Sequence, residues 1–149
     1  ALKVFSITTN NPVVDVVLNQ KYQAAQEHGI KMHVKVNDLS AVSVQTNELV
    51  VLLSNLLDNA IEACVKLDGK REIVCSIVKE EGIYLSIRNT SAPVKILHGE
   101  IATTKEDTAE HGYGLPAVKY ILNRLHAEYT FAYREGWFQF VAEIPESNS

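Results

Sequence analysis

One stretch constrains the fold of this chain more than any other: residues 48–66, ELVVLLSNLLDNAIEACVK. At about 100° per residue, its leucines cover one broad arc of a helix, and such a helix buries that arc in a core. A narrow polar stripe lies opposite, formed by Asn55, Asn59, Glu62 and Lys66. Solvated helix faces usually carry Glu, Lys and Arg, because Asn is a mediocre helix former. The two asparagines therefore suggest a binding site, and a solvated face is the alternative that this stretch alone leaves open.

Composition narrows the class of protein. A chain of 149 residues with 46% hydrophobic and 21% charged residues predicts one globular domain. Its net charge of -4 favours neither nucleic acid nor an anionic membrane surface as a partner. Cys64 and Cys75 are predicted to be buried thiols in a reducing compartment, and the five histidines show no metal-ligand spacing. We expect a cytoplasmic-type domain with no segment that spans a membrane.

Hydrophobic periodicity predicts the order helix, strand, helix, two strands, long loop, helix, two strands. Asn11 and Pro12 open the first helix, Gly29 closes it, and Thr46 is the predicted N-cap of the central helix. The other predicted elements are strands at residues 30–36, 73–78, 83–87, 128–133 and 137–144 and a helix at residues 115–125. Hairpins dominate the strand connections, so the order predicts a two-layer α/β sandwich with a mixed, mainly antiparallel sheet and three main helices.

The predicted domain covers residues 11–145. Residues 1–10 have no clear period and are interpreted as the trailing end of an upstream segment, and residues 146–149 as a disordered tail. Inside the domain, residues 89–112 show no convincing period. Loops of that length are typically lids or binding loops, and plain disorder is the alternative.

The sequence HGYGL, at residues 111–115, stands where this loop meets the third predicted helix. Glycines let a backbone approach a ligand, and a helix N-terminus offers free N–H groups to phosphate. Asn is a neutral oxygen ligand suited to Mg²⁺. The Asn-bearing helix face, the long loop and the glycine-rich helix start together predict a Mg–nucleotide site. The motifs of P-loop, Rossmann and protein-kinase folds are absent from the sequence.

These residues carry a resemblance to a known family. NLLDNAIEA (residues 55–63) resembles the N-box of the GHKL superfamily of ATP-binding domains, and HGYGL (residues 111–115) resembles its G2 box. IATTKED (residues 101–107) and GWFQFVAEIP (residues 136–145) resemble the lid and the closing strand of peptide-sensing bacterial sensor histidine kinases. The resemblance implies a Bergerat-type ATPase fold, in which ATP lies between helices under a lid.

The resemblance also implies residue roles. Asn59 would coordinate the Mg²⁺ that bridges the ATP phosphates, with Asn55 assisting one turn back; the alternative for Asn55 is a structural hydrogen bond to the lid. Relatives that hydrolyse ATP carry a Glu general base at the position of Asn55, and an amide cannot take a proton from water. Lys105 is the second implied catalytic residue, or otherwise a solvated lysine. The implied ATP-binding set is Asn55, Asn59, Ala63, Asn89, Thr103, Thr104, Lys105, His111, Gly112, Tyr113, Gly114 and Leu115.

Two departures from the family pattern concern the adenine and phosphate ends of the site. The adenine-recognising DxGxG is represented by Asn89-Thr90-Ser91, and Asn89 could still accept a hydrogen bond from the adenine amino group. The position three residues after Asn59, basic in many kinases, is Glu62. Lys66 or Lys105 would supply the missing charge, and the sequence does not decide between them.

The implied function is that of the ATP-binding catalytic domain of a two-component sensor histidine kinase. The γ-phosphoryl group would pass to a histidine in an upstream dimerisation segment absent from this chain, and then to a response regulator. The full protein would be a membrane-anchored homodimer. One alternative is a degenerate GHKL module that acts as a protein-interaction domain. A chaperone- or repair-type ATPase is the other, and it needs a base near Asn55 and a longer chain.

Overall fold

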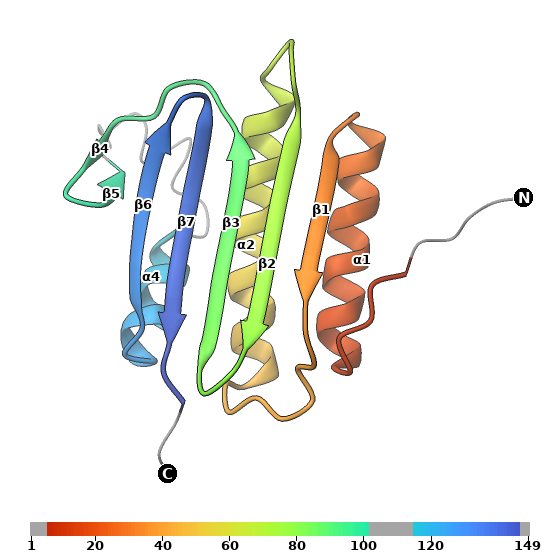
Figure 1. The fold of residues 1–149 in the computed structure, drawn as a ribbon, viewed down its shortest axis with the longest axis vertical. Coiled ribbons are helices and arrows are strands. Elements are labelled where there is room, and N and C mark those ends of the chain that lie inside the picture. Colours follow the sequence, from red (N-terminus) through yellow and green to blue (C-terminus); the bar gives the residue numbers. More distant parts are fainter. Residues whose placement is uncertain (1–5, 102–114, 147–149) are drawn as a thin grey trace, which may run out of the picture.

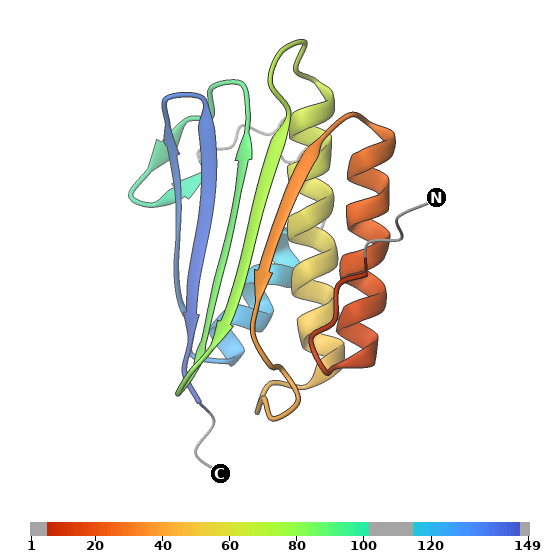
Figure 2. The same cartoon turned by 45° about the vertical axis from the view of Figure 1, so that its right-hand side comes forward.

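The computed structural model describes residues 6–101 and 115–146. Within these residues, three helices lie on one face of a five-stranded sheet and make a two-layer α/β sandwich (Figures 1 and 2). The helices are α1 (Pro12–Glu27), α2 (Thr46–Val65) and α4 (Leu115–Arg124). The strands of the sheet are β1 (Lys31–Val36), β2 (Glu72–Lys79), β3 (Ile83–Thr90), β6 (Glu128–Arg134) and β7 (Trp137–Ile144). The predicted fold class is confirmed.

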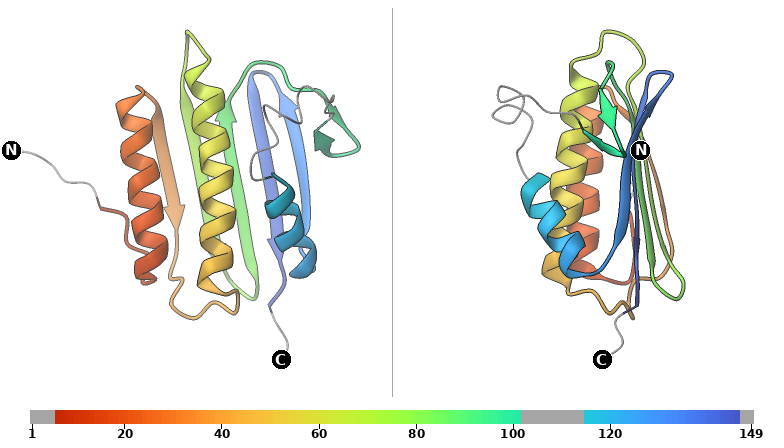
Figure 3. Two further views of the ribbon diagram at one scale, coloured as in Figure 1. Left: turned by 180° about the vertical axis from the view of Figure 1, so that it is seen from behind. Right: turned by 90° about the vertical axis from the view of Figure 1, so that its left-hand side faces the viewer.

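The sheet is mixed and mainly antiparallel, as predicted. Its strand order is β1-β2-β3-β7-β6, with β1 parallel to β2 and every other pair antiparallel. The parallel pair requires a crossover, and α2 supplies it. Seen from the helical side, α2 lies between α1 and α4 and covers the middle of the sheet (Figure 3).

The ends of α1 follow from its terminal residues. Asn11 is the N-cap and accepts a hydrogen bond from Val14 N at 3.3 Å, and Pro12 occupies the first turn. His28 is the C-cap, and Gly29 follows it with a φ of 66°, a left-handed conformation that favours glycine. Both predicted ends of this helix are confirmed.

The central helix starts one residue earlier than predicted. α2 begins at Thr46 with Gln45 at the N-cap position and no side-chain cap, so the prediction of Thr46 as the N-cap is wrong. Thr46 Oγ1 instead accepts a hydrogen bond from Asn11 Nδ2 at 3.4 Å, which joins the starts of α1 and α2. The leucine arc is buried as predicted, at Leu49, Leu52, Leu53, Leu56 and Leu57.

The core lies between the helices and the inner face of the sheet. Alternating residues of β3 point inward and are nearly fully buried, namely Ile83, Leu85 and Ile87. Phe131 of β6 and Phe140 of β7 face each other with ring centroids 5.3 Å apart. Cys64 and Cys75 are free, buried thiols, as predicted.

The segment predicted to lack a pattern contains a short hairpin. Strands β4 (Ile96–Leu97) and β5 (Glu100–Ile101) pair antiparallel, and His98 and Gly99 reverse the chain with positive φ angles of 53° and 75°. The prediction of irregular structure is therefore wrong for residues 96–101, because two-residue strands are too short to give a hydrophobic period.

Part of the N-terminal segment packs on α1. Ile7 and Thr9 are buried, at 7% and 1% exposure. Ile7 N donates to Asn19 Oδ1 at 2.9 Å, and Thr9 N and Oγ1 donate to Asp15 Oδ1 at 2.7 and 2.6 Å. These contacts attach residues 7–9 to the folded domain.

No helix within residues 6–101 and 115–146 combines the length and the hydropathy needed to cross a membrane.

Candidate functional site

A cavity of about 420 Å³ lies between α2 and the inner face of the sheet. Helix α2 lines one side with Leu56, Asn59, Ala60, Glu62, Ala63 and Lys66. The opposite side is apolar and is formed by Ile87, Phe131, Phe138 and Phe140. The rim is formed by Ser91, Ala92, Pro93, Val94, Lys95, Ile101 and Leu115. The cavity is thus a largely apolar pocket with a few polar groups, the usual composition of a small-molecule site.

The aromatic side of this cavity is built by strand alternation. Phe131 on β6 and Phe138 and Phe140 on β7 all point to the helical side, because residues two apart on a strand share a face. Phe131 and Phe138 are stacked, with ring centroids 5.8 Å apart and an interplanar angle of 22°. A planar ring can stack on a flat apolar surface of this kind, and the stacking removes the two touching faces from water.

Asn89 adds one buried amide to the lining of the cavity. Its side chain is 2% exposed, and its Nδ2 donates to the backbone oxygen of Thr90 at 3.0 Å. That bond uses one of the two Nδ2 hydrogens, and Oδ1 is the acceptor that the amide can offer to a ligand. A buried oxygen of this kind selects for a ligand that donates a hydrogen bond.

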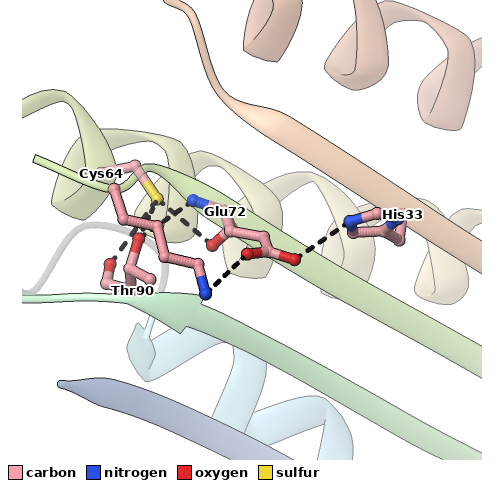
Figure 4. Close-up of polar contacts among 5 residues, drawn as sticks. His33, Cys64, Glu72 and Thr90 are labelled. Carbon is pink, nitrogen blue, oxygen red and sulfur yellow. Dashed lines mark hydrogen bonds and ion pairs between the residues drawn. The ribbon is translucent and has the colours of Figure 1, made fainter.

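Thr90, the residue that follows Asn89 in the sequence, links the sheet to α2 (Figure 4). The Sγ atom of Cys64, on α2, lies 3.6 Å from Thr90 O, 3.5 Å from Thr90 Oγ1 and 3.6 Å from Glu72 O. Glu72 N donates to Thr90 Oγ1 at 3.0 Å, and the Glu72 carboxylate contacts His33 and Lys70 at 3.0 and 3.2 Å. These contacts fix the distance between the Asn89 strand and the α2 wall.

Most, but not all, of the polar stripe of α2 lines the cavity. Asn59, Glu62 and Lys66 line it, as does Ala63, so most of the predicted stripe faces one site. Asn55 is half-buried, and its Nδ2 donates to Val51 O at 2.8 Å within the same helix. Asn55 is not among the described residues that line the cavity. The structure therefore brings Asn59, Ala63, Asn89 and Leu115 together. Asn55 lies one turn before Asn59, toward the N-terminus of α2.

Three charged side chains stand around the cavity. Glu62, Lys66 and Lys95 are all exposed at its edge. Within the described part of the chain, none of the three forms an ion pair. Two free cations and one free carboxylate at a cavity entrance leave charge available to an ionic ligand.

Several predicted site residues lie outside the described part of the chain. They are Thr103, Thr104, Lys105, His111, Gly112, Tyr113 and Gly114. The site also contains residues that the sequence pattern did not single out: the three phenylalanines, Ile87, the 91–95 segment and Ile101. The aromatic alternation in residues 129–140 was a usable signal for an aromatic wall, but it did not show which ligand or helix the wall would face.

Comparisons with known proteins agree on one family. A family model described as GHKL domain matches residues 44–145. The sensor histidine protein kinase HK06 of Streptococcus pneumoniae is 30% identical over 142 residues, which cover 89% of this chain and 30% of HK06. The chain thus spans about a third of the length of this relative.

Solved structures show the same fold. The catalytic domain of the histidine kinase ThkA, in a nucleotide-free form, has a TM-score of 0.73 at 20% identity and covers 99% of this chain and 100% of its own. ThkA in complex with the response regulator protein TrrA has a TM-score of 0.66 at 18% identity, and the match covers 96% of this chain and 41% of the ThkA chain. Full-length ShkA in complex with AMPPNP has a TM-score of 0.63 at 14% identity, and the match covers 100% of this chain and 32% of the ShkA chain. The match of the GHKL model to more than half of the sequence establishes that the chain belongs to the GHKL domain family.

Proposed function

We propose that this chain is the ATP-binding catalytic domain of a sensor histidine kinase, which binds Mg·ATP and donates the γ-phosphoryl group to a histidine on another segment. The observation that carries the proposal is the cavity of about 420 Å³ with an aromatic wall on one side and two amides, Asn59 and Asn89, on the others. An aromatic wall suits a purine base, and amide groups suit its polar edge and a hydrated metal. The relationship to sensor histidine kinases supports this choice among nucleotide-binding functions.

The base is proposed to lie against the phenylalanines with its amino group toward Asn89 Oδ1. With Nδ2 of Asn89 bonded to Thr90 O, Oδ1 is the acceptor that this amide would offer to the base. An acceptor there favours adenine, whose exocyclic group donates, over guanine, whose corresponding oxygen accepts. A neutral amide replaces the carboxylate of the family pattern without losing that acceptor.

The residues present fit a magnesium ion that arrives with the nucleotide. Mg²⁺ usually takes one or two protein oxygens and completes its shell with phosphate and water. Asn59 offers one such oxygen at the cavity wall, and no group of three His, Cys, Asp or Glu side chains in the described residues forms a preassembled metal site. When bound, the ion would neutralise phosphate charge, and Asn59 would orient it.

Phosphoryl transfer is favoured over hydrolysis by the side chains on α2. Asn55 is an amide whose Nδ2 bonds to the helix backbone, and an amide cannot act as a base toward water. The role of Lys105 in closing over the phosphates remains part of the proposal.

The proposed acceptor and partners lie beyond this chain. The acceptor is a histidine in an upstream dimerisation segment of the same or the partner protomer, and a response regulator receives the phosphoryl group next. We further propose that the full-length protein is a homodimer anchored in the bacterial cell membrane. Tethering would raise the effective concentration of the acceptor, so the isolated domain should be a poor kinase.

A titration tests the nucleotide site. AMPPNP is added to the 149-residue chain and to Asn59→Ala, each with Mg²⁺ and with EDTA, and heat is measured by calorimetry. We expect Mg²⁺ to strengthen binding by the unaltered chain and to have little effect on Asn59→Ala. Asn123→Ala, an exposed substitution on α4, is the control. Equal Mg²⁺ dependence in the unaltered chain and Asn59→Ala would contradict the role of Asn59.

The second candidate is a GHKL module that binds a protein partner without catalysis. It is favoured by Glu62, because a carboxylate beside the cavity repels phosphate when no metal is bound. The titration separates the two candidates. Absence of AMPPNP binding at millimolar concentration with Mg²⁺ would support the interaction module, whereas ATP-dependent labelling of an added acceptor segment would support the kinase.

A further inference from the structure

The β4–β5 hairpin lies at the edge of β6 (Figure 1), and its residue Ile101 lines the cavity. Phe131 N donates to Gly99 O at 2.7 Å, so the hairpin turn bonds directly to the strand that carries one wall residue. The approach is close, because a Cβ atom at Gly99 would lie 2.5 Å from Thr130 Oγ1. The hairpin is therefore held at one fixed position along β6.

Glu100 of this hairpin reaches across to α4. Its Oε2 lies 2.9 Å from Lys119 Nζ, and the two side chains are 43% and 38% exposed. Oε2 itself has no access to solvent and makes no well-aligned hydrogen bond within the described residues, so charge attraction dominates the contact. Tyr129 lies nearby on β6, and its pKa is raised first by burial and then by the negative charge of Glu100.

Each member of the ion pair adjoins a residue of the cavity rim. Ile101 follows Glu100 directly, and Leu115 lies one helical turn before Lys119. Ile101 and Leu115 line the cavity, whereas Glu100 and Lys119 are not among its described lining residues. The contact thus joins two cavity-lining positions that belong to segments separated along the chain.

We propose that Glu100 and Lys119 are positioning residues of the nucleotide site: their ion pair holds Ile101 and Leu115 in place relative to each other at the rim of the cavity that would receive the base. The inference rests on the proposed function. The pair acts through the apolar rim and touches no phosphate, so it governs affinity for the base. Its loss should weaken adenosine and AMPPNP binding by the same factor.

Calorimetry on the 149-residue chain tests the inference with AMPPNP and with adenosine. Lys119→Met and Glu100→Gln should each weaken both ligands about two- to fivefold, the range expected for a half-exposed pair. The exchanged pair, Glu100→Lys with Lys119→Glu, should restore affinity to within a factor of about two. Lys21→Met is the matched control, because it breaks the 2.6 Å ion pair with Asp58 between α1 and α2, away from the cavity.

The outcomes are separable from those of the proposed function. If the unaltered chain binds AMPPNP and both single variants bind it equally well, the inference is overturned and the nucleotide site stands. If the unaltered chain binds no nucleotide, the proposed function fails and this inference fails with it. A weakening in both variants that the exchanged pair does not reverse, or that Lys21→Met shows equally, reflects a general structural effect and overturns the positioning role.

Discussion

Arg124 Nε lies 2.8 Å from Glu48 Oε2, and this contact joins the last turn of α4 to the first turn of α2. The Glu48 side chain is only 9% exposed, and its Oε1 has no hydrogen-bond partner among the described residues. Arg124 remains 48% exposed. The pair therefore holds one end of α4 on α2, while the other end of α4 brings Leu115 to the cavity rim.

Arg124→Met should destabilise the domain by leaving the buried Glu48 carboxylate without its cation. The exposed guanidinium is screened by solvent, so we expect a loss of about 1–3 kcal/mol, below that of a fully buried pair. Urea unfolding followed by circular dichroism measures it. The double variant with Glu48→Gln should lose less than the sum of the two single variants, and strict additivity would show that the two side chains do not interact.

Asn89→Ala should remove the selectivity for an adenine base. We expect AMPPNP affinity to fall about five- to fiftyfold, because the buried acceptor contributes one hydrogen bond to the ligand. The preference for adenosine over inosine should fall toward one, and this ratio is insensitive to any loss of stability. Both ligands are compared by calorimetry, with Asn123→Ala as the control. Retained preference in Asn89→Ala would assign base recognition to another residue.

Gly99→Ala should loosen the hairpin from β6. The substitution forces a Cβ into a left-handed backbone, at a φ of 75°, and against Thr130 Oγ1. Amide hydrogen exchange at Phe131, whose N–H donates to Gly99 O, should accelerate about tenfold, which corresponds to a local loss of about 1.4 kcal/mol. Gly136→Ala is the control: it also places an alanine at a positive φ, but the new Cβ would have open space around it. A comparison of the two variants separates the backbone strain from the steric contact with Thr130. Unchanged exchange at Phe131 would mean that the hairpin adjusts without cost.

Cys75 should make the domain less stable at high pH. Burial raises the pKa of its thiol from 9.0 to about 12, so the unfolded chain releases this proton at lower pH than the folded one. Below pH 9 the protonated thiol makes its full contribution to the free energy of unfolding. Between pH 9 and pH 12 that free energy should fall by about 1.4 kcal/mol per pH unit. The measurement is urea unfolding across that range, with Cys75→Ala as the reference. Parallel pH profiles for the two proteins would exclude the thiol as the cause.

Fold class followed from local pattern because each main element carries its own period. The leucine arc of α2, the Asn11-Pro12 start of α1 and the alternation in β7 are each visible within one turn or one strand. Predictions failed where a contact with a residue distant in the sequence decides the local structure. Thr46 has a capping side chain, yet its hydroxyl is taken by Asn11, a partner from another helix. The β4–β5 hairpin depends on docking to β6, which its short strands cannot reveal.

The candidate site likewise has one part that local sequence pattern predicts and another part that depends on tertiary packing. The sequence by itself determined that α2 carries a polar stripe opposite its leucines, because helical spacing fixes which residues share a face. Only the tertiary structure decided that this stripe meets Asn89 and three phenylalanines across a cavity, with Asn59 facing it and Asn55 bonded to its own helix. The reason is physical. Residues on one helix are related by its regular geometry, whereas the distance between α2 and β3 is set by the packing of buried side chains and by the contacts of Cys64 with Thr90.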